Sequence, residues 1–167
     1  IAQCLVGSEM CIRDSYKAVA AAAGLAYGQK VGAESAVDIN LAKQLNVLIG
    51  QLGVDPANVV MNVGSAAAGY GFEYVVSTMD RVKAAALSQG DVQLQMPIIT
   101  PVADEAWNVK EAMASEADMP EWGSQEERGI DMEIETAAAV LASGSNAVIL
   151  KHPASVATIS KLINELV

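Results

Sequence analysis

Residues 58–83 constrain the fold of this chain more than any other stretch, because they form one complete strand, loop and helix unit. Residues 59–63 are a short and nearly continuous apolar run, which is typical of a parallel strand covered on both faces. From residue 72 to residue 86, apolar side chains recur at helical spacing. Between strand and helix, residues 64–71 are mostly glycine, serine and alanine, so the backbone there is bare. The loop therefore either turns tightly or presents a surface against which a large flat ligand can lie.

The glycine-rich loop lacks the marks of a nucleotide-binding loop. A P-loop requires Lys followed by Ser or Thr after its last glycine, whereas here Gly69 is followed by Tyr70 and Gly71. The dinucleotide fingerprint G-x-G-x-x-G is absent as well. Both interpretations of the loop, a turn and a ligand surface, stay open at this point.

The strand and helix pattern recurs on both sides of this unit. Apolar runs predict strands at residues 30–35, 94–100 and 147–150, and helical spacing predicts helices at residues 16–27, 39–52, 105–113, 130–143 and from 153 onward. Asp38 is suited to the N-cap of its helix, and Pro153 to the first position of the last helix. The polar and acidic residues 114–129 predict a long loop.

Repeated βα units favour right-handed crossovers and a parallel sheet. Four such units make either half of a (β/α)8 barrel or a small open sheet. Since neither a nucleotide fingerprint nor an order reversal is evident, we expect an α/β fold that forms the carboxy-terminal half of a TIM barrel. The first and last strands of such a half would expose their edges and promote aggregation.

Residues 1–15 are interpreted as a non-native segment, which leaves residues 16–167 as the half barrel. The run LVGSEMCIRD at residues 5–14 closely resembles a translated sequencing-library adapter, with Cys4 and Ser15 as flanking codons. The alternative is an unusual but genuine amino terminus. Both cysteines, Cys4 and Cys11, lie in this segment, so their spacing supports neither a disulfide nor a metal site.

Composition narrows the classes of partner. The formal net charge is −10 and no Lys/Arg cluster is present, which argues against nucleic acid or an anionic membrane as partner. No apolar run approaches the roughly 20 residues of a membrane span. Residues 16–167 contain no cysteine, and we therefore expect a cytoplasmic protein. We also expect a core of aliphatic side chains, because aromatic residues make up only 4% of a chain that is 52% hydrophobic.

Five segments make the chain recognisable. They are VDINLAKQLNVLI (37–49), AAAGYGFEYVVSTMDRVKAAAL (66–87), LQMPIITPVADEAW (94–107), PEWGSQEERGI (120–130) and AVILKHPASV (147–156). In this order they resemble the carboxy-terminal half of the delta subunit of the acetyl-CoA decarbonylase/synthase complex. In acetogenic bacteria the counterpart of that subunit is the small subunit of the corrinoid iron-sulfur protein.

The resemblance implies a TIM-barrel subunit that pairs with a larger subunit carrying a corrinoid and a [4Fe-4S] cluster. In that family the pair receives a methyl group on cobalt from a methylated tetrahydropterin, by way of a methyltransferase, and delivers it to acetyl-CoA synthase. The barrel mouth faces the corrinoid. No iron-sulfur cluster or other metal is expected on this chain, and no residue of it is expected to be catalytic.

In a TIM barrel, function belongs to residues at the carboxyl ends of the strands. A corrinoid is a broad ring edged with amides, which requires small residues and hydrogen-bonding partners. The cofactor contacts predicted on this basis are Asp38, Asn40, Asn62, Ser65, Gly69, Tyr70, Gly71, Thr100, Lys151 and His152. The strand-end rule also selects Ser35, Glu105 and Trp107, the last two with a possible partner role.

Several of these residues have simpler roles open to them. Asp38 is suited to capping its helix, and a lone His152 beside Pro153 is suited to helix entry and makes no metal site by itself. The family often has Asp-Pro where this chain has Asn62 followed by Val63, so Asn62 departs from its pattern. Residues 126–128 predict a solvated loop, and residues 121–123 are an interface candidate.

Three functions remain to be weighed. One is a non-catalytic subunit that covers the corrinoid of another chain. The second is a catalytic methyltransferase that moves methyl from tetrahydropterin to cobalt, an activity described for archaeal members. The third is a generic aldolase-like barrel, for which Lys151 is the single candidate for a Schiff base.

Overall fold

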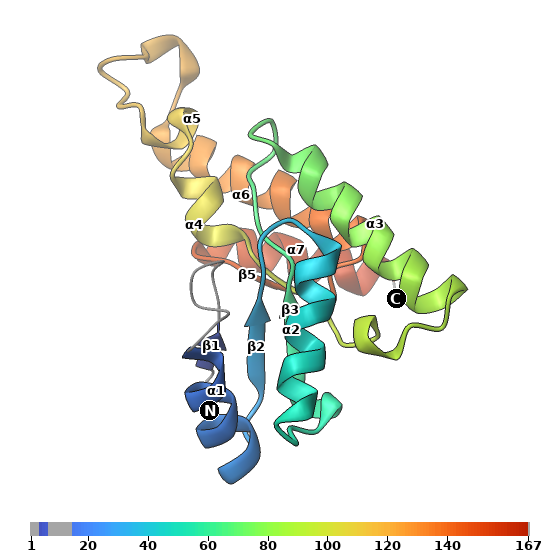
Figure 1. Ribbon diagram of the computed structural model, residues 1–167. Coiled ribbons are helices and arrows are strands. Elements are labelled where there is room, and N and C mark those ends of the chain that lie inside the picture. The colour runs from blue at the N-terminus through green and yellow to red at the C-terminus, as the bar shows by residue number, and fades with distance from the viewer. Residues whose placement is uncertain (1–3, 7–14, 167) are drawn as a thin grey trace.

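Five short strands pair in parallel in the computed structural model, which describes residues 4–6 and 15–166 (Figure 1). They are β1 (Cys4–Val6), β2 (Val31–Glu34), β3 (Val59–Asn62), β4 (Ile99–Pro101) and β5 (Ala147–Ile149). β2 lies between β1 and β3, and β4 pairs with β5. A parallel bridge between Met61 and Ile98 connects β3 to β4. Strands that are neighbours in the sequence are therefore neighbours in space, and their carboxyl ends face the same way.

Helices fill the connections between the strands. They are α1 (Ser15–Val19) continuing into the π-helix η1 (Ala20–Ala26), α2 (Ile39–Gln51), α3 (Phe72–Ser88), α4 (Val102–Trp107), α5 (Lys110–Met113), α6 (Gln125–Ala142) and α7 (Pro153–Leu166). Single 3-10 turns lie at Pro56–Asn58, Val92–Leu94 and Pro120–Trp122. Asp38 is the N-cap of α2, since its carboxylate accepts from the backbone N–H of Asn40 at 2.7 Å. The predicted cap and the predicted start of α7 at Pro153 are both confirmed.

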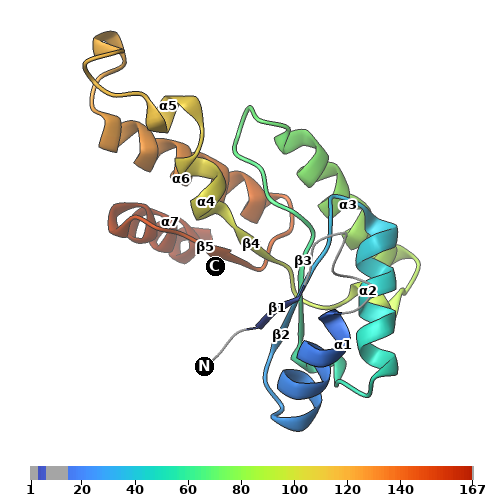
Figure 2. The same cartoon turned by 60° about the vertical axis from the view of Figure 1, so that its left-hand side comes forward.

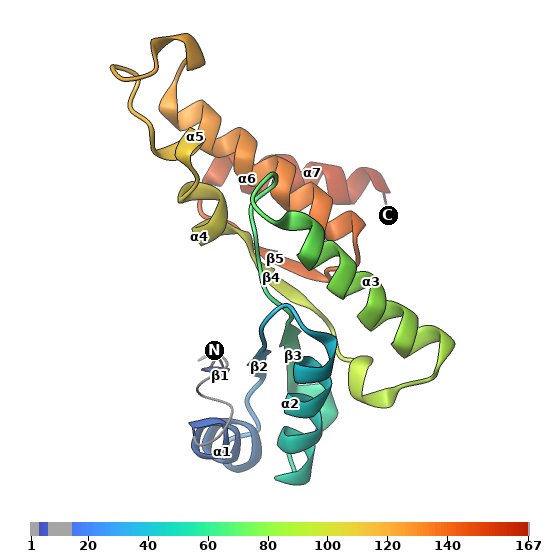
Figure 3. The same ribbon diagram turned by 45° about the horizontal axis from the view of Figure 1, so that its top comes forward.

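The helices lie in two groups around the strands. Figure 2 shows α1, α2 and α3 beside β1, β2 and β3, and α4 to α7 beside β4 and β5. In the second group α6 contacts α4, α5 and α7, as Figure 3 shows from above. Leu45, Ile49, Met61, Met79 and Ile98 are fully buried between helices and strands. Each such side chain contributes about 1.5–3 kcal/mol through its removal from water.

The predicted helix at residues 105–113 is wrong in its bounds. The structure has two helices there, α4 beginning already at Val102 and α5 beginning at Lys110, separated by Asn108 and Val109. Val102 and Ala106 are buried against the core, and Val109 is buried in a separate cluster with Ala112. Burial of two apolar groups against different neighbours therefore overrides a single straight helix.

The predicted loop at residues 114–129 is too long, because α6 begins at Gln125. The side chain of Glu116 accepts from the backbone N–H of Gln125 at 3.0 Å, which satisfies one of the free donors at the start of this helix. Residues 126–128 are thus the first turn of α6 and not a solvated loop. Arg128 donates to the carbonyl oxygens of Glu111, Gly123 and Ala114, so it fastens the remaining loop to the helix.

Residues 1–3, 7–14 and 167 lie outside the described residues. The prediction that residues 1–15 are non-native falls mostly on them and stays a prediction. Within the described part of the chain, no helix has both the length and the apolar character required to cross a bilayer.

Candidate functional site

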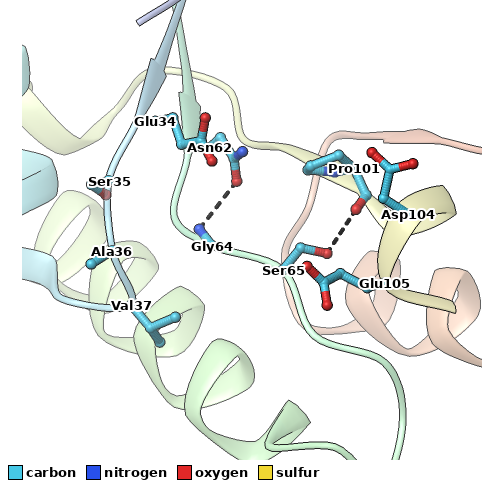
Figure 4. A pocket seen from close by; sticks show the side chains of 10 residues that line it. All are labelled: Glu34, Ser35, Ala36, Val37, Asn62, Gly64, Ser65, Pro101, Asp104 and Glu105. Carbon is cyan, nitrogen blue, oxygen red and sulfur yellow. Dashed lines mark hydrogen bonds between the residues drawn. The ribbon is translucent and has the colours of Figure 1, made fainter. Parts of the chain in front are cut away.

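A cavity of about 580 Å³ opens where β2, β3 and β4 end (Figure 4). Parallel pairing brings these three carboxyl ends together, although they are separated by long stretches of sequence. The lining residues are Glu34, Ser35, Ala36, Val37, Asn62, Gly64, Ser65, Pro101, Asp104 and Glu105. Its volume and position are those of a small-molecule site in an α/β protein.

Two side chains of the cavity hold its walls together. Asn62 is buried, and its Oδ1 accepts from the backbone N–H of Gly64 at 3.1 Å. Ser65 Oγ donates to the carbonyl oxygen of Pro101 at 2.8 Å, which ties the loop after β3 to the end of β4. Figure 4 shows both hydrogen bonds on the cavity wall. The Asn62 amide nitrogen has no hydrogen-bond partner among the described residues.

Ser35 is a buried polar residue of the cavity whose hydroxyl is unsatisfied among the described residues. It is only 3% exposed, and its Oγ has no hydrogen-bond partner within the described part of the chain. Leaving a buried hydroxyl without a partner costs about 1–3 kcal/mol. A ligand that reaches Ser35 would recover this free energy.

Glycines shape the loop that follows β3. Gly64, Gly69 and Gly71 have φ values of 98°, 82° and 85°, a region that other residues adopt only with strain. A Cβ at Gly64 would also lie 2.6 Å from Cγ2 of Val37, whereas one at Gly69 would meet nothing within 4 Å. The turn interpretation therefore accounts for these glycines, and the open side of Gly69 leaves room beside the loop.

Tyr70, at the tip of this loop, points away from the cavity residues toward α5. Its hydroxyl donates to Glu111 at 2.7 Å. The hydrogen bond to the Glu111 carboxylate raises the pKa of Tyr70 above its ordinary value. The same bond holds the pKa of Glu111 below its usual range.

A second cluster surrounds Trp107. The imidazole ring of His152 lies 5.9 Å from the indole ring, and the ammonium group of Lys151 lies 5.1 Å from it. His152 Nε2 is 3.2 Å from the Glu126 carboxylate, while its Nδ1 accepts from the backbone N–H of Ala154 at 3.2 Å. Through Nδ1, His152 caps the first turn of α7.

Glu133 on α6 holds the backbone of Lys151 and His152 in this cluster, and the sequence patterns did not select it. Its carboxylate is fully buried and accepts from the backbone N–H groups of Lys151 at 2.5 Å and His152 at 3.1 Å. The sequence offers one signal for it, an acidic residue in a helix that packs with α7, but no signal for its partners.

The structure divides the ten predicted cofactor contacts among different places. Asn62 and Ser65 line the cavity, together with Ser35 and Glu105 from the wider strand-end set. Lys151 and His152 belong to the Trp107 cluster. Of the others, Asp38 caps α2, Asn40 is exposed, and the side chain of Thr100 is fully buried, 2.9 Å from Ser145 Oγ. Gly69, Tyr70 and Gly71 form the loop beyond the cavity.

Glu34 and Asp104 also line the cavity, and sequence reasoning missed them. Each directly precedes a selected residue, Ser35 and Glu105, so widening the strand-end rule by one position finds both. Among residues 16–166, no group of three or more His, Cys, Asp or Glu side chains is arranged to hold a metal ion.

Residues 121–123, the interface candidate, fold against α5 and α6. The Trp122 ring lies 5.7 Å from the Lys110 ammonium and 5.9 Å from the Arg128 guanidinium. The interface role itself stays a prediction.

Parallel βα units with a cavity at their carboxyl ends define an α/β protein whose candidate site is built from strand-end loops. The chain belongs to the CO dehydrogenase/acetyl-CoA synthase delta subunit family, because the sequence model of that family matches residues 3–161. This range includes part of the segment interpreted above as non-native. The family recognised from the five sequence segments is confirmed.

Similar proteins carry the same description. The chain is 33% identical over 170 positions to "Acetyl-CoA decarbonylase/synthase complex subunit delta 2" of Methanosarcina acetivorans, which covers 98% of this chain and 38% of the relative. It is 32% identical over 144 positions to the delta subunit of Archaeoglobus fulgidus, and this alignment covers 84% of this chain and 31% of the relative. It is 40% identical over 85 positions to the delta subunit of Methanopyrus kandleri, and this alignment covers 51% of this chain and 21% of the relative. The chain thus spans less than two fifths of the length of these relatives.

Proposed function

We propose that this chain is part of a subunit that covers a corrinoid carried by a larger iron-sulfur subunit. In this role it supports methyl transfer from a methylated tetrahydropterin, by way of a methyltransferase, to acetyl-CoA synthase. The observation that carries the proposal is the cavity beside a bare loop, lined by polar side chains at the strand ends of a chain in the delta subunit family. Neither nucleic acid nor a membrane is part of the proposal.

The residues of the cavity fit a ring edged with amides. Asn62 has amide hydrogens available and Ser35 has an unpartnered buried hydroxyl, so both have hydrogen-bonding capacity to offer. Gly64 and Ser65 are small enough for backbone to approach a flat ring closely. We therefore assign Ser35, Asn62 and Ser65 to holding the corrinoid rim.

A bound corrinoid would supply the cobalt that carries the methyl group. The task left to this chain is to orient the ring and keep water away. The hydrogen bond from Ser65 to Pro101 and that from Gly64 to Asn62 fix the two loops before any ligand arrives. Preformed walls reduce the entropy that must be lost on binding, and no side chain of the cavity has to act as a nucleophile.

We also propose that the four parallel strands β2 to β5 are the later part of a closed (β/α)8 barrel. The supporting observation is an apolar groove between β5, α6 and α7, where Ile149, Val156 and Ile163 are 41–46% exposed. Further βα units of a longer subunit would pair with β5 and cover this groove.

The alternative function is catalytic transfer of methyl from tetrahydropterin to cobalt. One observation favours it: a cavity of about 580 Å³ suits a bicyclic heterocycle better than the whole face of a corrinoid ring. Carboxylates and an amide at its edge would orient such a heterocycle by its N–H groups.

One experiment separates the two functions. The longer subunit is purified alone and mixed with methyl-tetrahydropterin and free reduced corrinoid, and methylcobalt formation is followed by its absorption spectrum. The covering role predicts no turnover until both the larger subunit and the methyltransferase are added, and a stable complex of the two subunits on gel filtration. Turnover by the subunit alone would reject the covering role in favour of the catalytic one.

A further inference from the structure

We infer that the cavity at the ends of β2, β3 and β4 recognises its ligand through N–H groups that the ligand donates. This inference deepens the proposed function and depends on it only for the identity of the ligand. Two ligands of that function share the chemistry: the amide rim of a corrinoid and the amino-oxo edge of a pterin.

The acceptors of the cavity are left free. Glu34, Asp104 and Glu105 bring three carboxylates to its lining, and within residues 16–166 none of them forms an ion pair or a side-chain hydrogen bond. No Lys, Arg or His is among the lining residues. Donors are fewer than acceptors: the hydroxyl hydrogen of Ser65 is used by Pro101, which leaves the amide hydrogens of Asn62 and the hydroxyl hydrogen of Ser35.

Ser35 gives an independent reason to expect a ligand. The residue lies at the cavity wall and is 3% exposed, and its Oγ has no partner among the described residues, so its lone pairs and its hydrogen are both unpaired. Figure 4 shows Ser35 beside Glu34, on the opposite side of the cavity from Asp104 and Glu105. A ligand with N–H groups on two of its edges would satisfy acceptors on both sides at once.

The same lining residues determine which classes of ligand the cavity excludes. A phosphate or carboxylate ligand would approach three carboxylates with no cation to offset the repulsion. An ester in place of an amide would leave the acceptors of the protein facing acceptors of the ligand. The recognised class is therefore a neutral or cationic polar group with several N–H donors.

Isothermal titration calorimetry on the longer subunit tests this inference with two corrinoids. Dicyanocobinamide has an amide rim, and dicyanocobyrinic acid heptamethyl ester has the same macrocycle with an ester rim and no N–H group. Both are measured in the same cosolvent. We expect cobinamide to bind at least about tenfold more tightly, because hydrogen bonds from N–H groups to carboxylates are among the stronger ones.

Variants locate the effect in the cavity. The double variant Asp104→Asn, Glu105→Gln keeps the shape of both side chains but removes their charge, and we expect it to reduce the preference for cobinamide about tenfold. Ser35→Ala should reduce it as well while leaving thermal stability unchanged or higher, since the orphan hydroxyl is lost. Asp131→Asn, an exposed carboxylate on α6, is the matched control and should leave binding unchanged.

A third ligand, tetrahydrofolate, separates this inference from the proposed function. If both corrinoids bind equally and the double variant changes neither, recognition through N–H groups is wrong while corrinoid covering stands. If corrinoids do not bind but tetrahydrofolate does, and the double variant weakens it, the inference stands and the covering role fails. If none of the three ligands binds, or the variants bind every ligand as the unchanged protein does, the inference is overturned.

Discussion

Glu133 in the middle of α6 binds the backbone N–H of Lys151 at the end of β5, with 2.5 Å between Oε1 and N. Its second oxygen binds the N–H of His152 at 3.1 Å. A buried carboxylate thus fixes the turn from which the side chains of Lys151 and His152 reach Trp107.

We predict that Glu133→Ala destabilises the protein by about 2–4 kcal/mol, because it leaves two N–H groups unsatisfied in a buried place. Glu133→Gln keeps one acceptor oxygen and should cost less. Urea unfolding followed by circular dichroism measures both. Glu135→Ala, an exposed position of the same helix, is the control; equal stability of the Glu133→Ala and Glu135→Ala variants would contradict this role.

The steric role of glycine in the loop after β3 is testable with a matched pair. Gly64→Ala should cost about 2–4 kcal/mol, because it combines positive φ with a Cβ 2.6 Å from Val37. Gly69→Ala has a similar φ but open space, so it should cost only about 1–2 kcal/mol. Adding Val37→Ala should rescue the first variant and not the second, as a double-mutant cycle from urea unfolding would show.

Acid sensitivity should depend in part on Asp91. The hydrogen bond from the Lys43 ammonium holds the pKa of the Asp91 carboxyl below its usual range. A lowered folded-state pKa contributes stability that is present above the ordinary value and is lost as pH falls through the lowered one. We therefore expect the melting temperature of the unchanged protein to exceed that of Asp91→Asn at pH 6, and the difference to shrink below about pH 4.

The Lys43→Met variant checks the cause of this effect. When Lys43→Met is already present, adding Asp91→Asn should change the pH dependence of the melting temperature much less, because the ion pair is already absent. A pH dependence that persists without Lys43 would assign the lowered pKa of Asp91 to another group.

Tyr70 offers a direct titration. Because the Glu111 carboxylate accepts its hydrogen bond and raises its pKa, Glu111→Gln should lower the pKa of Tyr70 toward the ordinary value. NMR titration of ring-labelled tyrosine measures this, with the Tyr70 signal assigned by its loss in Tyr70→Phe. The same Tyr70→Phe variant should exchange amide hydrogens faster at residues 64–71, since the loop then loses its hydrogen bond to Glu111 on α5. An unchanged titration in Glu111→Gln would mean that the hydrogen bond does not form in solution.

The apolar groove beside β5 predicts self-association of the chain by itself. Ile149 is exposed on β5, whose outer edge is unpaired among the described residues. Light scattering after gel filtration should show oligomers that Ile149→Lys reduces. Leu87→Lys, at an exposed apolar position on α3 outside the groove, should have no such effect. A monomer at every concentration, with one sharp melting transition, would contradict both the groove as an open interface and the half-barrel proposal.

Local signals were sufficient for most individual elements. The apolar run at residues 59–63 and the helical spacing after it correspond to β3 and α3, and the cap at Asp38 lies where its side chain and position require. Such features depend on neighbours within a few residues, so they can be inferred from the sequence. Where a helix start depends on a distant group, as at Gln125 with Glu116 as its cap, inference from local pattern failed.

The order of the strands and helices, and the family of the chain, were determined by the sequence alone, because periodicity and motif order are properties of the chain itself. The tertiary structure decided which side chains share a cavity. Ser35, Asn62 and Asp104 come from three strand ends, and only parallel pairing of β2, β3 and β4 makes them neighbours. It likewise decided that Glu133 serves the turn at Lys151, since a buried carboxylate persists only where backbone donors meet it in space.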